Sequence, residues 1–517
     1  MWENISAIYK TVQYSIKIGN RAMDPISSNL GLKQGCPLSP ILFNLYINNI
    51  ADYLTSKPED SVTLQDNNIS YFLYADDLVI VSSCKEGLQN QLDRLSQFAD
   101  SKDLTVNTKK SQVMIFNKSG KKLKKEKFTI KGTQLEVVSK YTYLGVDIPT
   151  SGSFSTSIAE LTNKAKKAMM PLFTTIMKFN IPFGKALQLF QTYIEPILLY
   201  NAENQTAMTD REIEKCRMDR NHIYTIASES PLTRTQLKFT KFVMGVGKYC
   251  PNMAIFGESA AIPLLTRAQI HLMKFWDRIK NMEVDTLVNL AYRENLAMNS
   301  NWCKTVQTLN SIYNLHAREH EPKDFPSMVK KLIKNDFISY WKSRISNPSV
   351  EKKLSLYAKI KREFTIEPYS NLPFKDRQII AKIICVSHKL KVETERHQDQ
   401  YIPREERICS LCTLNKVEDE GHFIAECCAY DQVRLKHFGR KKLSKAEEMI
   451  AQEDPSVLAS YLRESYTLRE NLMEEPTSEK YHVYHKKGLK MTLRKGPKVG
   501  KVCNITKDGL KIRITQF

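Results

Sequence analysis

The feature that most constrains the fold of this chain is a pair of adjacent aspartates, Asp76 and Asp77, between two short apolar runs. Residues 69–74 and 78–81 are rich in β-branched and aromatic side chains, and only Ala75 and the two aspartates separate them, which predicts a β-hairpin with the acids at its tip. Neighbouring carboxylates at such a tip are costly unless cations neutralise them. The pattern favours a metal site, although Asp is also common in ordinary surface turns.

A second pattern, over residues 31–49, predicts a loop followed by a helix. Ser39 is placed to cap a helix whose first position is Pro40. Further residues follow at helical spacing, namely Leu42, Leu45, Tyr46 and Asn49. Before the helix, Gln34 and Gly35 let the backbone approach a flat ligand closely, because glycine has no Cβ. We expect the hairpin at residues 74–77 to pack against this helix.

Four segments in a fixed order resemble the motifs of reverse transcriptases. Residues 31–49 resemble motif B, residues 74–77 motif C and residues 104–116 motif D, and residues 141–148 resemble the primer-gripping hairpin of non-LTR retrotransposon enzymes. The resemblance implies a polymerase palm and RNA-directed DNA polymerisation. It also implies an RNA template, a DNA target that serves as primer, dNTP substrates and Mg²⁺ as the catalytic metal.

The resemblance also implies roles for single residues, carried over by position. Asp76 and Asp77 would hold Mg²⁺, which in polymerases activates the attacking 3′-hydroxyl and steadies the triphosphate. Lys110 would be placed to donate a proton to the departing pyrophosphate, although a solvated surface lysine is an equally good interpretation. The residues expected beside the nucleotide or the primer–template are Gln34, Gly35, Tyr74, Leu144 and Gly145.

One motif of the family has no match in this sequence. Motif A supplies another metal-binding aspartate and lies before motif B, but the 30 residues before motif B contain only Glu3 and Asp24 as acids. Neither follows an apolar β-run, and Asp24 lies in a Met-Asp-Pro turn context. We therefore expect a truncated reverse transcriptase, without fingers or an N-terminal endonuclease, that is inactive alone.

A cluster of cysteines and a histidine predicts a zinc site. Cys409, Cys412, His422 and Cys427 offer three thiolates and one imidazole, which suit tetrahedral Zn²⁺. The start of the chain does not read as a secretory signal, so reduced metal ligands are favoured over disulfides. Reduced cysteines near a histidine are the simpler alternative. The segment resembles the knuckle after the thumb in non-LTR reverse transcriptases, where proline usually follows the last ligand; Cys428 stands there instead and leaves open which thiol binds.

The charge of the chain points to a polyanionic partner. Lys and Arg outnumber Asp and Glu by 77 to 56, which gives a net charge of +21. Basic clusters near Phe275 and Trp276 and before the knuckle suit a phosphate backbone, with a solvated helix face as the alternative. Their members are Arg267, Lys274, Arg278, Lys280, Lys382, Lys389, Lys391, Arg396, Arg404 and Arg407. No stretch approaches the ~20 apolar residues of a membrane span, and we expect an intracellular ribonucleoprotein of nucleus and cytoplasm.

We predict an α+β chain with five parts. These are a partial palm over residues 1–150, a helical thumb over 151–250, a helical, basic nucleic-acid-binding region over 251–400, a zinc knuckle with a following helix over 401–470 and a basic tail over 471–517. A capping box at Ser157 and Glu160 is expected to open the first thumb helix. Its apolar face is formed by Ile158, Leu161, Ala165, Ala168, Met169 and Leu172, with Lys164, Lys166 and Lys167 off that face.

Two other functions compete with an active polymerase. The first is a catalytically dead protein that binds nucleic acid through thumb and knuckle, which the unmatched motif A favours. The second is an intron maturase, which shares the palm but is disfavoured by a zinc knuckle after the thumb.

Overall fold

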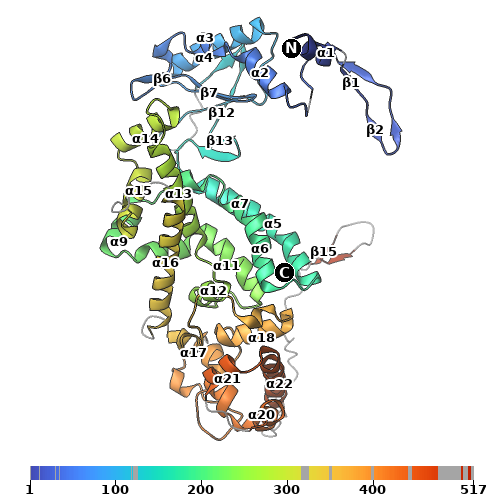
Figure 1. The fold of residues 1–517 in the computed structure, drawn as a ribbon, viewed down its shortest axis with the longest axis vertical. Coiled ribbons are helices and arrows are strands. Elements are labelled where there is room, and N and C mark those ends of the chain that lie inside the picture. Colours follow the sequence, from blue (N-terminus) through green and yellow to red (C-terminus); the bar gives the residue numbers. More distant parts are fainter. Residues whose placement is uncertain are drawn as a thin grey trace.

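The computed structural model describes residues 2–10, 12–28, 31–33, 35–117, 119, 126–315, 325–347, 352–397, 401–440, 445–474, 502–504 and 511–513. Figure 1 shows an elongated molecule with the N-terminal strands at one end and the helices of residues 431–474 at the other. Helices and short strands are mixed, so the coarse prediction of a mixed helix and sheet fold is confirmed.

The N-terminal part combines helices with strands that pair two by two. Its helices are α1 (Trp2–Lys10), α2 (Ser39–Ile47), α3 (Ile50–Leu54) and α4 (Lys85–Ser101). The antiparallel pairs are β1 (Val12–Tyr14) with β4 (Ile26–Ser28), β2 (Lys17–Ile18) with β3 (Arg21–Ala22), β5 (Val62–Leu64) with β6 (Asn67–Ile69), β7 (Tyr71–Tyr74) with β8 (Asp77–Ile80), β10 (Thr129–Ile130) with β11 (Thr133–Gln134), and β13 (Lys140–Tyr143) with β14 (Val146–Pro149). Strands β9 (Gln112–Met114) and β12 (Glu136–Val138) run parallel.

Two small apolar cores lie on either side of α4. Leu95 and Phe98 of α4 join the buried residues of α2 and α3 in the first core, namely Ile47, Ile50 and Leu54. Leu92 of α4 joins the second core, with Val113, Phe128, Ile130, Leu135 and Val137. Because α4 contributes to both, it links the hairpin region to the parallel strands.

The described residues between 155 and 474 form a helical body with a continuous core that runs from Ala165 to Leu462. Its helices are α5 (Ser155–Lys178), α6 (Phe183–Leu189), a π-helix (Phe190–Ile194), α7 (Glu195–Leu198), α8 (Ala202–Gln205), α9 (Asp210–Met218), α10 (His222–Glu229), α11 (Pro231–Met244), α12 (Asn252–Ser259), α13 (Leu264–Lys280), α14 (Leu287–Ala297), α15 (Asn301–Tyr313), α16 (Phe325–Ile345), α17 (Ser355–Ile360), α18 (Phe374–Ile384), α19 (Lys391–Thr394), α20 (Asp431–Phe438), α21 (Ala446–Gln452) and α22 (Pro455–Glu474). The buried residues of the knuckle, such as Phe423, belong to this same core.

Both predicted serine caps are wrong. Leu38 is the N-cap of α2, and the Ser39 hydroxyl instead donates to the Lys33 carbonyl at 2.7 Å. Helix α5 begins at Ser155, before Ser157, which is buried inside its first turn. In both helices the predicted serine is not the N-cap residue. The local pattern therefore predicts the helix but not its first residue.

The predicted two-sided character of α5 is confirmed. Leu161, Ala165 and Met169 are buried in the core, and Ile158, Ala168 and Leu172 pack against it. The three lysines on the other side, Lys164, Lys166 and Lys167, are exposed. One face of α5 therefore holds the body together while the other presents positive charge to solvent.

Two hydrogen bonds are among the contacts between the N-terminal part and the helical body. The Tyr200 hydroxyl, just after α7, donates to the Leu144 carbonyl at the turn between β13 and β14. The Gln65 amide between β5 and β6 donates to the Glu294 carboxylate of α14 at 2.7 Å. These contacts tie both outer hairpins to helices far along the chain.

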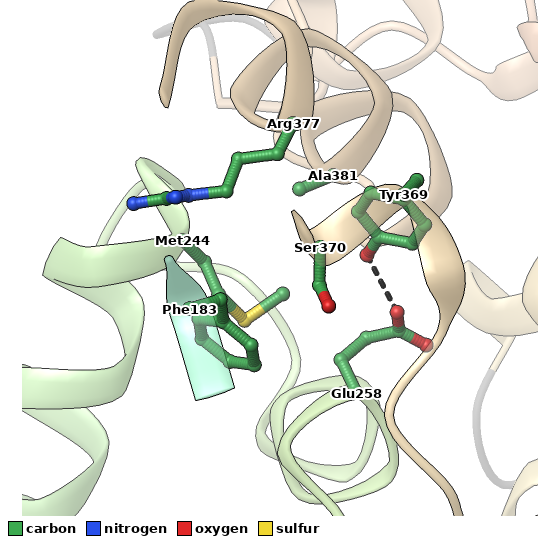
Figure 2. Close-up of a pocket in the computed structure, with 7 residues that line it drawn as sticks. All are labelled: Phe183, Met244, Glu258, Tyr369, Ser370, Arg377 and Ala381. Atoms are coloured by element: carbon green, nitrogen blue, oxygen red, sulfur yellow. Dashed lines mark hydrogen bonds between the residues drawn. The ribbon is translucent and has the colours of Figure 1, made fainter. Parts of the chain in front are cut away.

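A buried polar cluster lies inside the body between α12 and α18. Figure 2 shows the Tyr369 hydroxyl donating to Glu258, with Ser370, Met244 and Arg377 around the same small cavity. Glu258 also stands 3.6 Å from the Lys361 ammonium, and both side chains are almost fully buried. This ion pair lets charged groups remain within the core.

Within the described ranges, no helix is both long and apolar enough to cross a lipid bilayer. In the predicted basic tail, strands β15 (Val502–Asn504) and β16 (Lys511–Arg513) pair antiparallel. Most of residues 475–517 lie outside the described residues.

Candidate metal centres

The predicted hairpin with acids at its tip is confirmed. Strands β7 and β8 pair from Tyr71 with Ile80 to Tyr74 with Asp77, which leaves Ala75 and Asp76 as the turn. Ala75 has a φ of +53°, in the left-handed region that non-glycine residues seldom adopt. Asp76 and Asp77 are exposed, so their carboxylates are accessible to cations and to a polyanionic substrate.

The hairpin is held by apolar contacts with the predicted helix. Tyr71, Leu78 and Ile80 pack against the core that includes Ile47 of α2 and Phe98 of α4. The base of the hairpin is therefore fixed while its tip projects, and the prediction that it packs beside the helix near Ser39 is confirmed. Tyr74, next to the turn, is 64% exposed and free to meet a ligand.

A second hairpin lies close to the acidic tip. Leu144 and Gly145 form the turn between β13 and β14, and both have positive φ, +47° and +80°. Glycine suits such a turn because it adopts positive φ without a Cβ clash. Tyr143 at the end of β13 is half-buried, and its pKa is raised first by burial and then by the negative charge of Asp77. Asp77 is therefore close enough to Tyr143 for its charge to act on the second hairpin.

The other residues predicted to serve the palm are Gly35, Gln34 and Lys110. Gly35 has a φ of +80° with open space where a Cβ would point, as a ligand-facing loop requires. Gln34 lies outside the described residues. Lys110 is exposed in a turn in which its backbone N–H donates to the Asn107 carbonyl at 3.1 Å. In the described part of the chain, no third Asp, Glu, His or Cys forms a metal-sized group with Asp76 and Asp77.

The four predicted ligands of the knuckle converge. The ligand atoms of Cys409, Cys412, His422 and Cys427 all lie within 4.8 Å of one another. Tetrahedral zinc would separate two sulfurs by about 3.8 Å and a sulfur from a nitrogen by about 3.6 Å. The observed distances are 3.9 Å between the Sγ atoms of Cys409 and Cys427 and 3.4 Å between Cys412 Sγ and His422 Nε2. Cys428 is exposed and outside the group, so Cys427 is the fitting thiol.

A π-helix over His422–Glu426 brings the last two ligands together. The Cys427 N–H donates to the His422 carbonyl at 2.8 Å, an i to i+5 bond that sets both residues on one side of the turn. Glu426 accepts from Lys416 at 3.0 Å and stands 3.6 Å from His422 Nδ1, which leaves Nε2 facing the thiols. A carboxylate behind a histidine ligand is the usual way to fix its ring.

The protonation of the thiols also favours a cation. A hydrogen bond from Cys427 lowers the pKa of Cys409 to about 3. The same bond, together with burial, raises the pKa of Cys427. Metal binding requires thiolates, so a divalent cation at this cluster would displace thiol protons and offset the negative charge of the sulfurs.

Comparison with known proteins identifies the N-terminal part. Residues 3–148 match the family model described as reverse transcriptase (RNA-dependent DNA polymerase). This segment is part of a reverse transcriptase domain. The matched segment contains α2 and the hairpins β7–β8 and β13–β14. The family match therefore covers the hairpin that carries Asp76 and Asp77.

The curated relatives of the reverse transcriptase segment come from non-LTR elements. A Pol polyprotein from the type-1 retrotransposable element R2 of Popillia japonica is 24% identical over 37% of this chain and 31% of its own length. An R2 Pol polyprotein of Nasonia vitripennis is 33% identical over 25% of the chain and 13% of its own length. That of the type-2 element R2DM of Drosophila melanogaster is 32% identical, with the same coverage. The chain thus aligns with 31% or less of the length of these relatives.

The sequence patterns around the reverse transcriptase segment missed several structural residues. Tyr200, which braces the turn at Leu144, gives no local signal because it lies 56 residues away. One predicted nucleic-acid contact is also wrong. Arg407 is buried and donates to the Ile402 and Val392 carbonyls, so it serves the fold instead.

Proposed function

We propose that the chain acts as part of an RNA-directed DNA polymerase of a non-LTR retrotransposon. The observation that carries this proposal is the family match over residues 3–148, together with the hairpin that exposes Asp76 and Asp77 and the hairpin that turns at Leu144 and Gly145. Mg²⁺ bound by the two aspartates would activate a primer 3′-hydroxyl and neutralise the triphosphate. The second tip would hold the primer end beside it.

The remaining assignments complete this proposal. Residues 1–150 form a partial palm, 151–250 a thumb, 251–400 a basic helical region, 401–470 a zinc knuckle and 471–517 a basic tail. The template is RNA, the primer is target DNA and the substrates are dNTPs. Gln34, Gly35 and Tyr74 lie beside the nascent pair, and Lys110 donates a proton to pyrophosphate. The protein works as a ribonucleoprotein in nucleus and cytoplasm.

We assign Zn²⁺ to Cys409, Cys412, His422 and Cys427. The support is the match between the ligand separations and a tetrahedral zinc. Zinc there would be structural, because all four positions are taken by protein ligands. Its place is at the end of the molecule opposite the hairpins, near α20 and α22 (Figure 1).

A second candidate is a nucleic-acid-binding protein without polymerase activity. One specific observation favours it: among the residues the structure describes, no third ligand joins Asp76 and Asp77. Both candidates require nucleic-acid binding; they differ in whether Asp76 and Asp77 bind the catalytic metal.

Binding to single-stranded RNA is expected to weaken steeply with salt, because lysines release counterions from phosphates. Replacing the exposed Lys164, Lys166 and Lys167 of α5 by Gln is expected to make the plot of log K against log[salt] less steep by about 2. Each lost phosphate contact lowers the steepness by ~0.7, and three contacts are lost. Fluorescence anisotropy across a salt series measures this slope.

The matched control replaces three exposed lysines of α16, Lys330, Lys331 and Lys334, by Gln. Because α16 lies in the basic helical region over residues 251–400 and not on the open face of α5, this variant is expected to change the slope less than the α5 variant does. Equal slopes for both triple variants would show that the open face of α5 is not the contact.

A further inference from the structure

The knuckle contains a buried arginine that the proposed zinc site does not use as a ligand. Arg434, on α20, is 0% exposed. Its guanidinium donates to the Cys427 carbonyl and, at 3.3 Å, to the Ile424 carbonyl. It also pairs with the Asp431 carboxylate at 2.7 Å. A buried guanidinium with these partners is fully committed to one place in the fold.

The two carbonyls lie where the ligand-bearing turn leaves the π-helix. Cys427 follows the last residue of that helix in an extended conformation, with φ −62° and ψ 120°. Carbonyls at the end of a helix lack partners within it, so they need donors from elsewhere. Arg434 supplies donors to both, and the Tyr461 hydroxyl of α22 adds a second donor to Ile424 at 2.8 Å.

This geometry fixes the direction of one metal ligand. Arg434 holds the backbone of Cys427 by its carbonyl. In this position the Cys427 Sγ lies 3.9 Å from the Cys409 Sγ. Without the guanidinium each carbonyl would keep one other donor, the Tyr461 hydroxyl for Ile424 at 2.8 Å and the Tyr430 N–H for Cys427 at 3.2 Å. The bonds that tie both carbonyls to one side chain of α20 would be lost, which frees the turn and the Cys427 thiol to shift relative to the other three ligands.

We propose that Arg434 is a positioning residue for the metal centre, which holds Cys427 in place for tetrahedral coordination. The inference rests on the proposed metal site. Outer contacts that orient ligands typically change metal affinity by roughly 10- to 100-fold. We expect a loss of that size for Arg434→Met.

A purely structural arginine offers the matched control. Arg377 on α18 is 2% exposed and donates to the carbonyls of Ile181 at 3.3 Å and Leu372 at 3.4 Å. Figure 2 shows it beside Met244, Phe183 and the Glu258 cluster, in a different part of the core. Arg377→Met thus removes a similar buried guanidinium that touches no metal ligand.

The test titrates the full chain and both variants with Co²⁺ and then Zn²⁺, with the visible absorption of tetrahedral Co²⁺ as readout and a chelator as competitor. Thermal unfolding is recorded in parallel. We expect one tightly bound metal in the unchanged chain, at least about tenfold weaker binding in Arg434→Met, and binding within twofold of the unchanged chain in Arg377→Met, even where both variants melt lower.

Equal affinity in Arg434→Met and the unchanged chain, or equal weakening in both methionine variants, would overturn the role of Arg434. Absence of metal binding in the unchanged chain would overturn the metal site and this role with it. If Arg434→Met does not fold, Arg434→Lys and Arg377→Lys replace the pair. Because lysine keeps one donor group, Arg434→Lys is expected to bind the metal several-fold more weakly than the unchanged chain. Arg377→Lys is expected to bind it with unchanged affinity. Unchanged metal affinity in Arg434→Lys would refute the proposal.

Discussion

Replacing Cys427 by Ser in the zinc-bound chain is expected to lower the melting temperature by about 10 °C or more. Structural zinc contributes ~10 to 16 kcal/mol of binding free energy to folding. Loss of one thiolate ligand would remove several kcal/mol of it, at roughly 2 °C per kcal/mol for a large domain. The effect should spread beyond the knuckle, because Cys409 and Cys427 lie in the same core as residues of α18 and α22. Scanning calorimetry or circular dichroism measures it.

The neighbouring thiol provides the control. Cys428 is exposed and outside the ligand group, so Cys428→Ser is expected to leave both melting temperature and zinc content unchanged. A chelator should lower the melting temperature of the unchanged chain and of Cys428→Ser equally, and that of Cys427→Ser much less. Equal stability of all three proteins with and without chelator would contradict a structural metal.

The second large effect concerns catalysis. Primer extension on an RNA template with Mg²⁺ is expected to be undetectable for this 517-residue chain assayed alone. Two-metal transfer needs ligands on both sides of the metal pair, whereas Asp76 and Asp77 come from one hairpin and no further ligand joins them among the described residues. Each tenfold loss of rate corresponds to about 1.4 kcal/mol of barrier.

The control for this prediction is Asp76→Ala. Extension by the unchanged chain that disappears in Asp76→Ala would contradict the expected inactivity and establish a working polymerase. Equal background in both proteins is the result that we expect for the chain assayed alone.

Local patterns predicted the features whose partners are close in sequence. The β7–β8 hairpin follows from two β-prone runs around Asp76 and Asp77, and the knuckle ligands follow from residue type and spacing. The buried face of α5 follows from helical periodicity. In each case the signal lies within one element or one short loop.

Contacts between distant segments could not be read in the same way. Glu418 of the knuckle forms a buried ion pair with Arg469 of α22, 51 residues away, at 2.7 and 2.9 Å. The prediction that Arg407 contacts phosphate failed for a related reason. Its basic side chain and its place near the knuckle suggest a surface contact, but the structure buries it. The choice between a structural and a surface arginine is made by tertiary packing, which charge patterns do not encode.

In the proposed polymerase, the tip of β7–β8 holds the catalytic metal and the tip of β13–β14 lies beside it. Fe²⁺-directed cleavage tests this placement most directly, because the hydroxyl radicals that bound Fe²⁺ forms from hydrogen peroxide cut only the nearby polypeptide. The chain, saturated with zinc at the knuckle, is incubated with a primer–template, a dNTP and Fe²⁺ in place of Mg²⁺, and cleavage is started with hydrogen peroxide and ascorbate. We expect cuts near residues 74–78 and 143–146 that vanish in Asp76→Asn combined with Asp77→Asn. Cuts confined to other segments, or cuts at the hairpins that persist in the double variant, would contradict the claim.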